Sequence, residues 1–208
     1  MAFDDDILQQ QQVLPYLTSG EQDIVWRNLR TIASGGTANY FLSPYHDGFK
    51  DRVLQGDGRR GFQFFDFKKD KLYSVKGLVL SNSCDISPDN TRLVPSRIIF
   101  APLVKLATYR SLLEGICTDQ ERIEARIDSI KKQRTTNIFY LPAGDPLGEE
   151  YIIRFDEVQS MPMATYYDKQ GEKKKLFTLN DTGFYMLVFK LSIHFCRFEG
   201  GVRRDNSE

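Results

Sequence analysis

Ser81, Asn82, Cys84 and Asp85 lie in one short polar segment, SNSCD, directly after the apolar run Gly77–Leu80. Their hydroxyl, amide, thiol and carboxylate groups stand where a buried strand reaches the surface. Ser81, Asn82 and Asp85 are therefore candidate catalytic residues, and Cys84 is a further candidate as a nucleophile, although the sequence assigns it no basic partner. The alternative is structural: Asn82 and Asp85 form a turn, and Cys84 is a small packing residue.

Short apolar runs must position this segment. The runs Gly77–Leu80 and Ile98–Ala101 are rich in branched side chains and are bounded by polar turn residues, which predicts two buried strands. The aromatic run Phe62–Phe67 predicts a strand before them. Residues 138–142 and 151–155 predict two further strands that pair with each other.

Helical periodicity appears in three regions. Residues 19–34 and 106–135 contain apolar residues at helical spacing, the latter in two consecutive stretches. The last helix begins at Asn180 or Asp181, either of which can cap it. Its apolar face is expected to comprise Phe184, Leu187, Val188, Leu191 and Phe195.

The composition of the chain restricts its chemistry. The 208 residues include 28 Lys and Arg against 28 Asp and Glu, so only a local basic patch could attract nucleic acid. Three cysteines without a CxxC pair, with two histidines, make a zinc site hard to assemble; we expect no metal and no cofactor. The N-terminus lacks signal-peptide features, and no apolar run approaches the ~20 residues that cross a bilayer, which predicts a cytoplasmic protein without membrane association.

The order of elements predicts a mainly β fold with α additions, which is an α+β class. We expect a flexible N-terminal arm at residues 1–16, because three aspartates and four glutamines dominate it. A helical and loop extension at 17–60 leads into a main domain at 61–199. That domain contains a helical insertion at about 106–135, and a flexible tail at 200–208 follows it.

Several segments resemble, in order, those of the PemK/MazF family. Gly61–Phe67 resembles the family's opening Gly-Asp-Ile-Val-x-Val-Asp strand, and Val75–Asn82 looks like its second strand, usually Arg-Pro-Val-Val-Val-Leu-Ser-Asn. Ile98–Val104 is similar to Val-x-Val-Ala-Pro-Ile-Thr, and Ile153–Met161 to Val-x-x-Asp-Gln-Val-Arg-Ser-Ile. Leu176–Asp181 stands where the family has a Leu-Ser-Asp-like start to its final helix.

This resemblance covers roughly residues 61–105 and 138–196. It implies a small SH3-like β-barrel closed by a C-terminal helix, in a family of commonly dimeric endoribonuclease toxins that an antitoxin neutralises. The family cleaves RNA without a metal: the ribose 2′-OH attacks the adjacent phosphate, which requires a proton acceptor and cationic groups around the developing charge. Lys76 stands next to the position of the family's central Arg, and Val104 stands at that of its central Thr. Lys lacks the bidentate fork of Arg, and Val has no hydroxyl.

The sequence therefore predicts a divergent PemK/MazF-like protein of a bacterial or phage toxin, defence or counter-defence system. It would bind RNA or an antitoxin-like protein partner in the cytoplasm, with a homodimer as one assembly. Whether it is an endoribonuclease stays open. If it cleaves RNA, Lys76 would hold the phosphate while Ser81, Asn82 and Asp85 shape the site.

Further cations are candidates for RNA binding, namely Arg59, Arg60 and Lys105. The alternative function is a non-enzymatic protein-interaction module that has lost the family's catalytic residues. Such a module would present its aromatic residues to a partner. The candidates are Phe62–Phe67, Trp26, Tyr166 and Tyr167.

Overall fold

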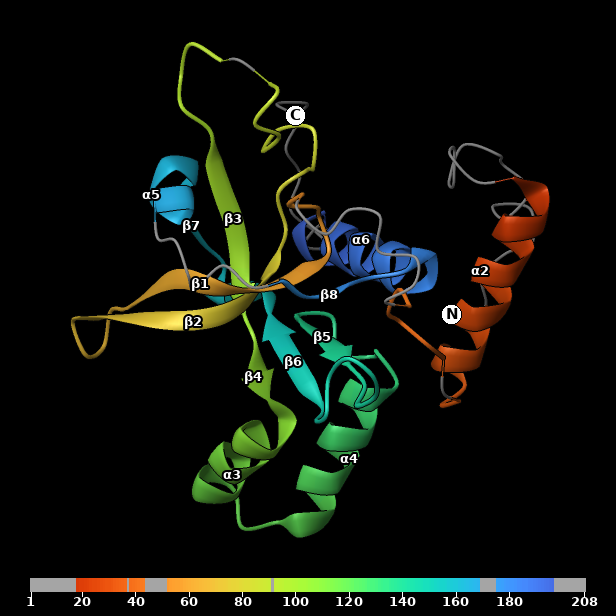
Figure 1. Cartoon of the computed structure of the whole chain (residues 1–208). Coiled ribbons are helices and arrows are strands. Elements are labelled where there is room, and N and C mark those ends of the chain that lie inside the picture. The colour runs from red at the N-terminus through yellow and green to blue at the C-terminus, as the bar shows by residue number, and fades with distance from the viewer. Residues whose placement is uncertain (1–17, 37, 44–51, 91, 169–174, 197–208) are drawn as a thin grey trace, which may run out of the picture.

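The computed structural model describes most of the chain, namely residues 18–36, 38–43, 52–90, 92–168 and 175–196. The expected arm at residues 1–16 and tail at 200–208 lie outside these ranges. The described part is an α+β protein, as expected, and its helices and strands are arranged around two antiparallel sheets (Figure 1).

The elements follow one another in an order that begins and ends with a helix. The strands are β1 (Asp57–Asp66), β2 (Lys71–Val79), β3 (Arg97–Pro102), β4 (Val104–Lys105), β5 (Ile138–Leu141), β6 (Tyr151–Arg154), β7 (Gln159–Pro162) and β8 (Lys175–Thr178). The helices are α2 (Ser19–Ala33), α3 (Leu106–Ile116), α4 (Gln120–Lys131), α5 (Met163–Asp168) and α6 (Asp181–Phe195), with a 3₁₀ turn η2 (Phe155–Glu157).

The two sheets are joined where the chain passes from β3 to β4. The larger sheet has the strand order β7-β3-β2-β1-β8, and the smaller has the order β4-β6-β5. A single residue, Leu103, separates β3 from β4, and its N–H donates a 2.9 Å hydrogen bond to the carbonyl of Lys76 in β2. The smaller sheet therefore begins directly beside the central strand pair of the larger one.

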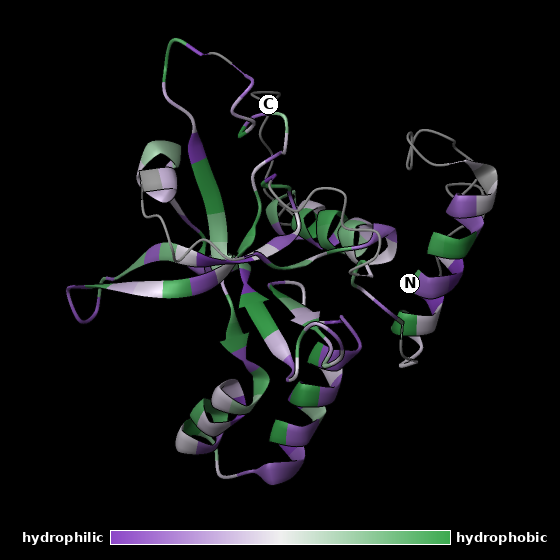
Figure 2. Ribbon diagram, viewed as in Figure 1, coloured by the Kyte–Doolittle hydropathy of each residue, from purple (hydrophilic) through white to green (hydrophobic). Residues whose placement is uncertain are grey.

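Alternating side chains of β2 and β3 divide the core between the two faces of the larger sheet. Leu78 and Ala101 enter a cluster shared with β5, β6, β8 and α6. Val79 and Phe100 enter a second cluster on the other face, covered by α5. A third cluster joins α3 and α4 to the smaller sheet. Figure 2 shows hydrophobic residues concentrated in β3, β4, β6 and α6.

Helix α6 begins as expected but buries a different face. The Asn180 side chain accepts a 3.0 Å hydrogen bond from the N–H of Gly183 and caps the helix. Of the five residues expected on the buried face, Leu187 alone is buried. The residues buried along this helix are Thr182, Gly183, Met186, Leu187 and Lys190. Apolar residues surround much of α6, so their spacing does not select one face.

Candidate functional site

The candidate site is built on a β-bulge in the β1–β2 hairpin. The register shifts between Arg59 and Phe62, so that Arg60 and Gly61 together stand opposite Lys76. Gly61 has a φ of 89°, a backbone conformation that favours glycine. Arg59 and Arg60 face opposite sides of the strand, as consecutive strand residues do: Arg59 is buried and Arg60 is exposed.

Arg59 belongs to a buried charge cluster rather than to the surface. Its side chain is 6% exposed, and its Nε lies 3.3 Å from Oδ2 of Asp57. Lys175 Nζ lies 3.3 Å from the same oxygen. The Thr178 hydroxyl donates a 2.8 Å bond to Oδ1. Burial raises the pKa of Asp57, and these partners oppose that shift. This geometry favours a structural role for Arg59 over the expected contact with RNA.

Lys76 and Lys105 each lie next to Tyr151. Lys76 Nζ is 5.7 Å from the ring centroid of Tyr151, which is a cation–π distance. Tyr151 of β6 pairs directly with Lys105 of β4, and directly paired residues share a face of a sheet. Two lysines that are 29 positions apart in sequence therefore meet where the two sheets join.

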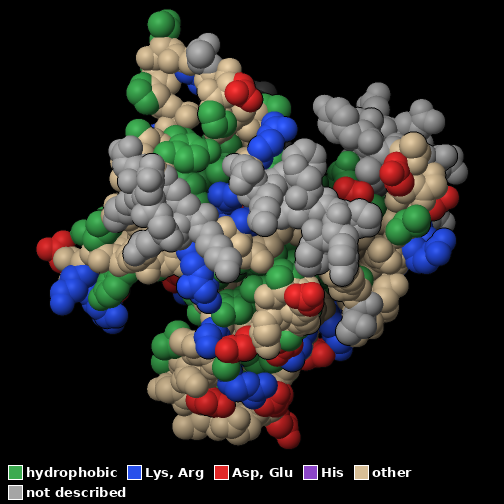
Figure 3. Space-filling model, in the orientation of Figure 1, with side chains coloured by type: hydrophobic (Ala, Val, Ile, Leu, Met, Phe, Trp, Pro, Cys, Tyr) green, Lys and Arg blue, Asp and Glu red, His purple; other side chains and the backbone are tan. Residues whose placement is uncertain are grey.

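We call the residues Arg60, Lys76 and Lys105 the cationic stripe, because they lie on β1, β2 and β4 across this junction. Figure 3 shows Lys and Arg side chains in a column down the middle of this face of the molecule. Lys105 Nζ lies 2.8 Å from Glu149 Oε1, and this carboxylate raises the pKa of Lys105. Within the described residues, neither Arg60 nor Lys76 forms an ion pair with a carboxylate.

The SNSCD segment lies elsewhere. Ser81 lies five positions after Lys76 along nearly extended chain, a span of about 16 Å. The Ser81 hydroxyl is buried and accepts a 2.7 Å hydrogen bond from the N–H of Ile99. The Asn82 side chain accepts a 2.9 Å bond from the N–H of Cys84, which is the turn geometry that the structural alternative predicts.

The end of this segment is exposed. Asp85 forms a 2.5 Å ion pair with Arg92, and Cys84 is an exposed free thiol. Ser81, Asn82 and Asp85 do line a common hollow of about 450 Å³, together with Arg92 and others. The structure thus places Lys76 next to Arg60 and Lys105 at the sheet junction, and it leaves the other candidate catalytic residues beyond the end of β2 at Val79.

Sequence reasoning missed two contributors to this region. Tyr151 was expected only as a strand residue, and Glu149 was not among the candidate site residues. The local sequence does not mark either residue as part of the site, because the pairing of Lys105 with Tyr151 depends on how β4 and β6 meet. The bulge does have a signal: a glycine after two arginines within an otherwise strand-like run.

The protein is thus defined by two joined antiparallel sheets with a cationic stripe at their junction. No model of a known protein family matches the chain, and a comparison with curated proteins finds no match. Within the described ranges, no helix is both long enough and apolar enough to cross a membrane. The same residues contain no group of three His, Cys, Asp or Glu side chains placed to hold a metal ion.

Proposed function

We propose that this chain is a divergent PemK/MazF-like protein of a toxin, defence or counter-defence system, and that it binds single-stranded RNA along the cationic stripe. The observation that carries the proposal is that Arg60 and Lys76 lie opposite each other on β1 and β2, while Lys105 of β4 lies across the sheet junction and pairs with the Tyr151 that Lys76 contacts. Phosphate contacts supply much of the affinity for nucleic acid. Because the formal net charge of the chain is zero, such affinity must come from a local arrangement of this kind.

The strand order supports the likeness to the PemK/MazF family. The three segments that resemble the family's first three strands form β1, β2 and β3, which are neighbours in one sheet. The segment 153–161 then adds β7 to the far side of β3, and α6 closes the chain. An SH3-like barrel is the finer interpretation that we propose for this arrangement of two joined sheets.

Cleavage of RNA would need more than the stripe. Val104, at the position of the family's central Thr, pairs with Ile152 and packs toward α3 and α4, and it offers no hydroxyl. Lys76 can neutralise a phosphate. Among the described residues, Glu149 is the carboxylate that pairs with the stripe, and it is therefore the candidate proton acceptor for an attacking 2′-OH.

RNA binding is tested with a fluorescein-labelled single-stranded RNA of about 12 nucleotides and fluorescence anisotropy at several salt concentrations. We expect Lys76→Ala and Lys105→Ala each to weaken binding several-fold. Each should also lower the slope of log K against log[salt] by about 0.7 per lost phosphate contact. Lys69→Ala is the matched control, because Lys69 is an exposed cation in the β1–β2 turn. Unchanged affinity in both stripe variants would exclude the stripe as the RNA site.

Cleavage is followed separately, by incubating the same RNA with the protein in excess EDTA. A metal-independent nuclease would cut the RNA, and Lys76→Ala would reduce the rate. Equal cutting by the two proteins would remove Lys76 from the mechanism. Binding without cutting would favour the loss of the family's catalytic function.

The second candidate function, a non-enzymatic interaction module, is favoured by the tip of the β1–β2 hairpin. Phe67 is 82% exposed and Leu72 57% exposed, an unusual display of apolar surface on a projecting hairpin (Figure 1). Tyr166, however, is fully buried and stacked on Phe62 at 5.1 Å, so the expectation that it faces a partner is wrong. Sedimentation velocity of the protein and of Phe67→Ser would show whether this tip joins two copies.

A further inference from the structure

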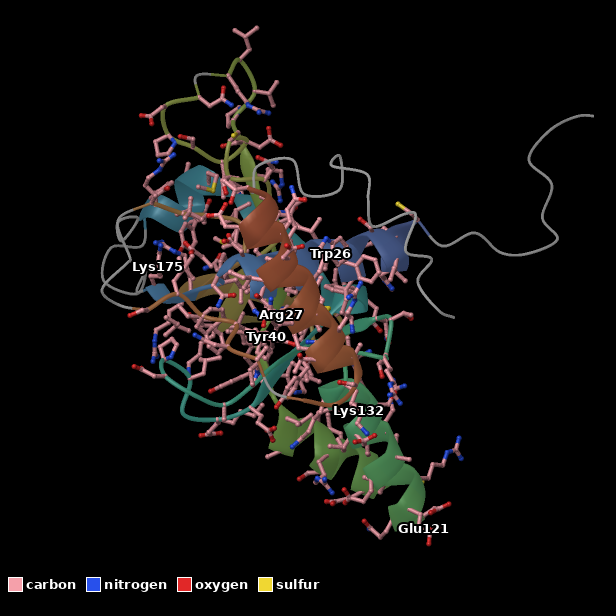
Figure 4. All side chains as sticks on the ribbon, turned by 90° about the vertical axis from the view of Figure 1, so that its right-hand side faces the viewer. Trp26, Arg27, Tyr40, Glu121, Lys132 and Lys175 are labelled. Atoms are coloured by element: carbon pink, nitrogen blue, oxygen red, sulfur yellow. The ribbon has the colours of Figure 1, made fainter. Side chains whose placement is uncertain are left out.

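Helices α2 and α6 enclose an apolar groove that the RNA-binding proposal does not use. The groove has a volume of about 480 Å³, and its lining includes Lys132, Gln133, Arg134 and Thr136 from the segment after α4. Its α2 wall includes Trp26, Leu29 and Ala33, and its α6 wall includes Phe189 and Ile193. Figure 4 shows Trp26 on the side of α2 that lies toward α6. The volume is within the range of about 300–1,000 Å³ that binding pockets commonly have.

The way α2 is attached leaves this groove open. Val25 and Ile32 are buried, and the Asn28 side chain donates a 2.9 Å hydrogen bond to the Thr182 hydroxyl of α6. These residues, at helical spacing, fasten one face of α2 to the protein. The adjacent face, which carries Trp26 and Ala33, therefore lines the groove instead of closing it.

The two walls have the geometry that receives a third helix. On α2 the lining residues recur from position 26 to 33, and on α6 from 185 to 193. At 1.5 Å per residue each wall is about 10–12 Å long, which is roughly two helical turns. An amphipathic helix that binds in such a groove uses apolar anchors at i, i+3 or i+4, and i+7, which cover the same length.

The charged residues that line the groove are all cations. Arg30, Lys132 and Arg134 line it, and no Asp or Glu is among the lining residues that the structure describes. Arg134 also donates to the carbonyl of Ala33 at 3.3 Å, which holds its guanidinium at the edge of the groove. Lys132 pairs with Asp128 at 2.8 Å, so its charge is partly neutralised.

Lys190 also lines the groove but does not recognise a ligand. It is 3% exposed, and its three N–H groups all have acceptors within the protein. Recognition of charge therefore depends on the rim, where the positive side chains favour an acidic partner.

We propose that the groove between α2 and α6 binds an acidic amphipathic helix of a partner protein. Apolar side chains on one face of that helix would fill the groove between Trp26 and Ile193. Its carboxylates would face Arg30 and Arg134 at the rim. This site is independent of the cationic stripe, so either proposal can fail without the other.

The probe is a fluorescein-labelled peptide of about 16 residues with Leu at i, i+3, i+4 and i+7 and Glu at the polar helix positions. One control peptide has the same composition in shuffled order, and another has Lys in place of Glu. Trp26 is the single tryptophan of the chain, so its emission reports occupancy directly. We expect the patterned acidic peptide to bind at least about tenfold more tightly than either control and to shift the Trp26 emission to shorter wavelength.

Variants of the groove complete the test. Ile193→Asp should weaken peptide binding at least about tenfold, whereas Leu112→Asp, on the 60%-exposed Leu112 of α3, should not change it. Arg134→Gln should weaken binding several-fold and reduce its salt dependence. Circular dichroism melts establish that each variant is folded. Equal binding of the three peptides, or full binding by both groove variants, would overturn the proposal.

Two other occupants of the groove are distinguished by the same measurements. If deletion of residues 1–17 increases peptide affinity about tenfold or more, the groove belongs to a segment of this chain, and the proposal of a partner helix is wrong. If the Trp26 emission depends on protein concentration without peptide, a second copy occupies the groove, and the proposal is again wrong. Constant emission and unchanged affinity after the deletion support a partner.

Discussion

Lys190 of α6 donates a 2.7 Å hydrogen bond to the backbone carbonyl of Thr135, just beyond the end of α4. The same ammonium donates to the carbonyl and the side-chain oxygen of Gln133, at 3.0 and 3.1 Å. A cation near the carbonyl end of a helix is favourably placed. Lys190 therefore links α6 to the segment that follows α4, which packs on the smaller sheet. Burial lowers the pKa of this amine to about 7.

We predict that Lys190 makes stability depend on pH. The pKa of Lys190 is about 7 in the folded protein and 10.5 for an unperturbed lysine. Between these values the unfolded chain binds more protons than the folded chain, so the free energy of unfolding should rise with pH. The slope for one proton is at most about 1.4 kcal/mol per pH unit. Urea unfolding of the protein and of Lys190→Met at several pH values above 7 would measure it, because the variant lacks this slope. Parallel curves would mean that the three acceptors keep Lys190 protonated throughout the range.

We predict that Glu149→Gln strengthens RNA binding. Glu149 holds the ammonium of Lys105 at 2.8 Å, so its carboxylate competes with phosphate and repels it. Removal of that charge should increase affinity a few-fold at low salt, and the gain should shrink as salt screens the charges. Anisotropy titrations would measure it, with Glu121→Gln on α4 as the control. If RNA cutting is observed and Glu149→Gln abolishes it while binding improves, Glu149 acts as the proton acceptor.

We predict opposite effects of the same substitution at two glycines. A Cβ on Gly58 would lie 2.1 Å from the buried ring of Phe177, whereas a Cβ on Gly115 would have nothing within 4 Å. Gly58→Ala should therefore lower the free energy of unfolding by about 1–3 kcal/mol or more through overpacking. Gly115→Ala, within α3, should raise it by up to about 1 kcal/mol through helix propensity. Denaturant titrations would measure both, and equal stability of the two variants would contradict the packing around Gly58.

We predict that Ser81 stabilises the fold without contributing to RNA binding. Ser81→Ala leaves the N–H of Ile99 without its acceptor, which should cost about 1–3 kcal/mol of unfolding free energy. The affinity for RNA should stay unchanged, because Lys76 lies a strand length away. Cys84→Ser, at an exposed position, should change neither quantity. A loss of RNA affinity in Ser81→Ala, with the protein still folded, would restore the SNSCD segment to the site.

Much of the architecture was predictable because it depends on local patterns. Alternating and continuous apolar runs marked β2, β3, β5 and β6, and the cap of α6 at Asn180 followed from side-chain chemistry. The beginning of β1 at Asp57 was not expected, because glycines and arginines hide the strand before Phe62. The prediction of the buried face of α6 was wrong. Lys190 is buried on this helix because residues 133–135 supply acceptors for its ammonium, and no local pattern reveals them.

The site was predictable only in part. Lys76, Arg60 and Lys105 could be proposed singly, since cations beside strands are visible in the sequence. Their meeting depends on a bulge, which Gly61 signals locally, and on the short connection at Leu103, which is a tertiary feature. Arg59 and Arg60 are indistinguishable by type, yet alternation along β1 buries one and exposes the other.

The single-residue connection at Leu103 has a mechanical consequence. The stripe takes Arg60 and Lys76 from one sheet and Lys105 from the other, so a polyanion that contacts all three bridges both sheets. Such a ligand would restrict motion of the two sheets relative to each other. It should slow hydrogen exchange of the Leu103 amide, because this N–H donates a hydrogen bond to the carbonyl of Lys76 where the two sheets meet.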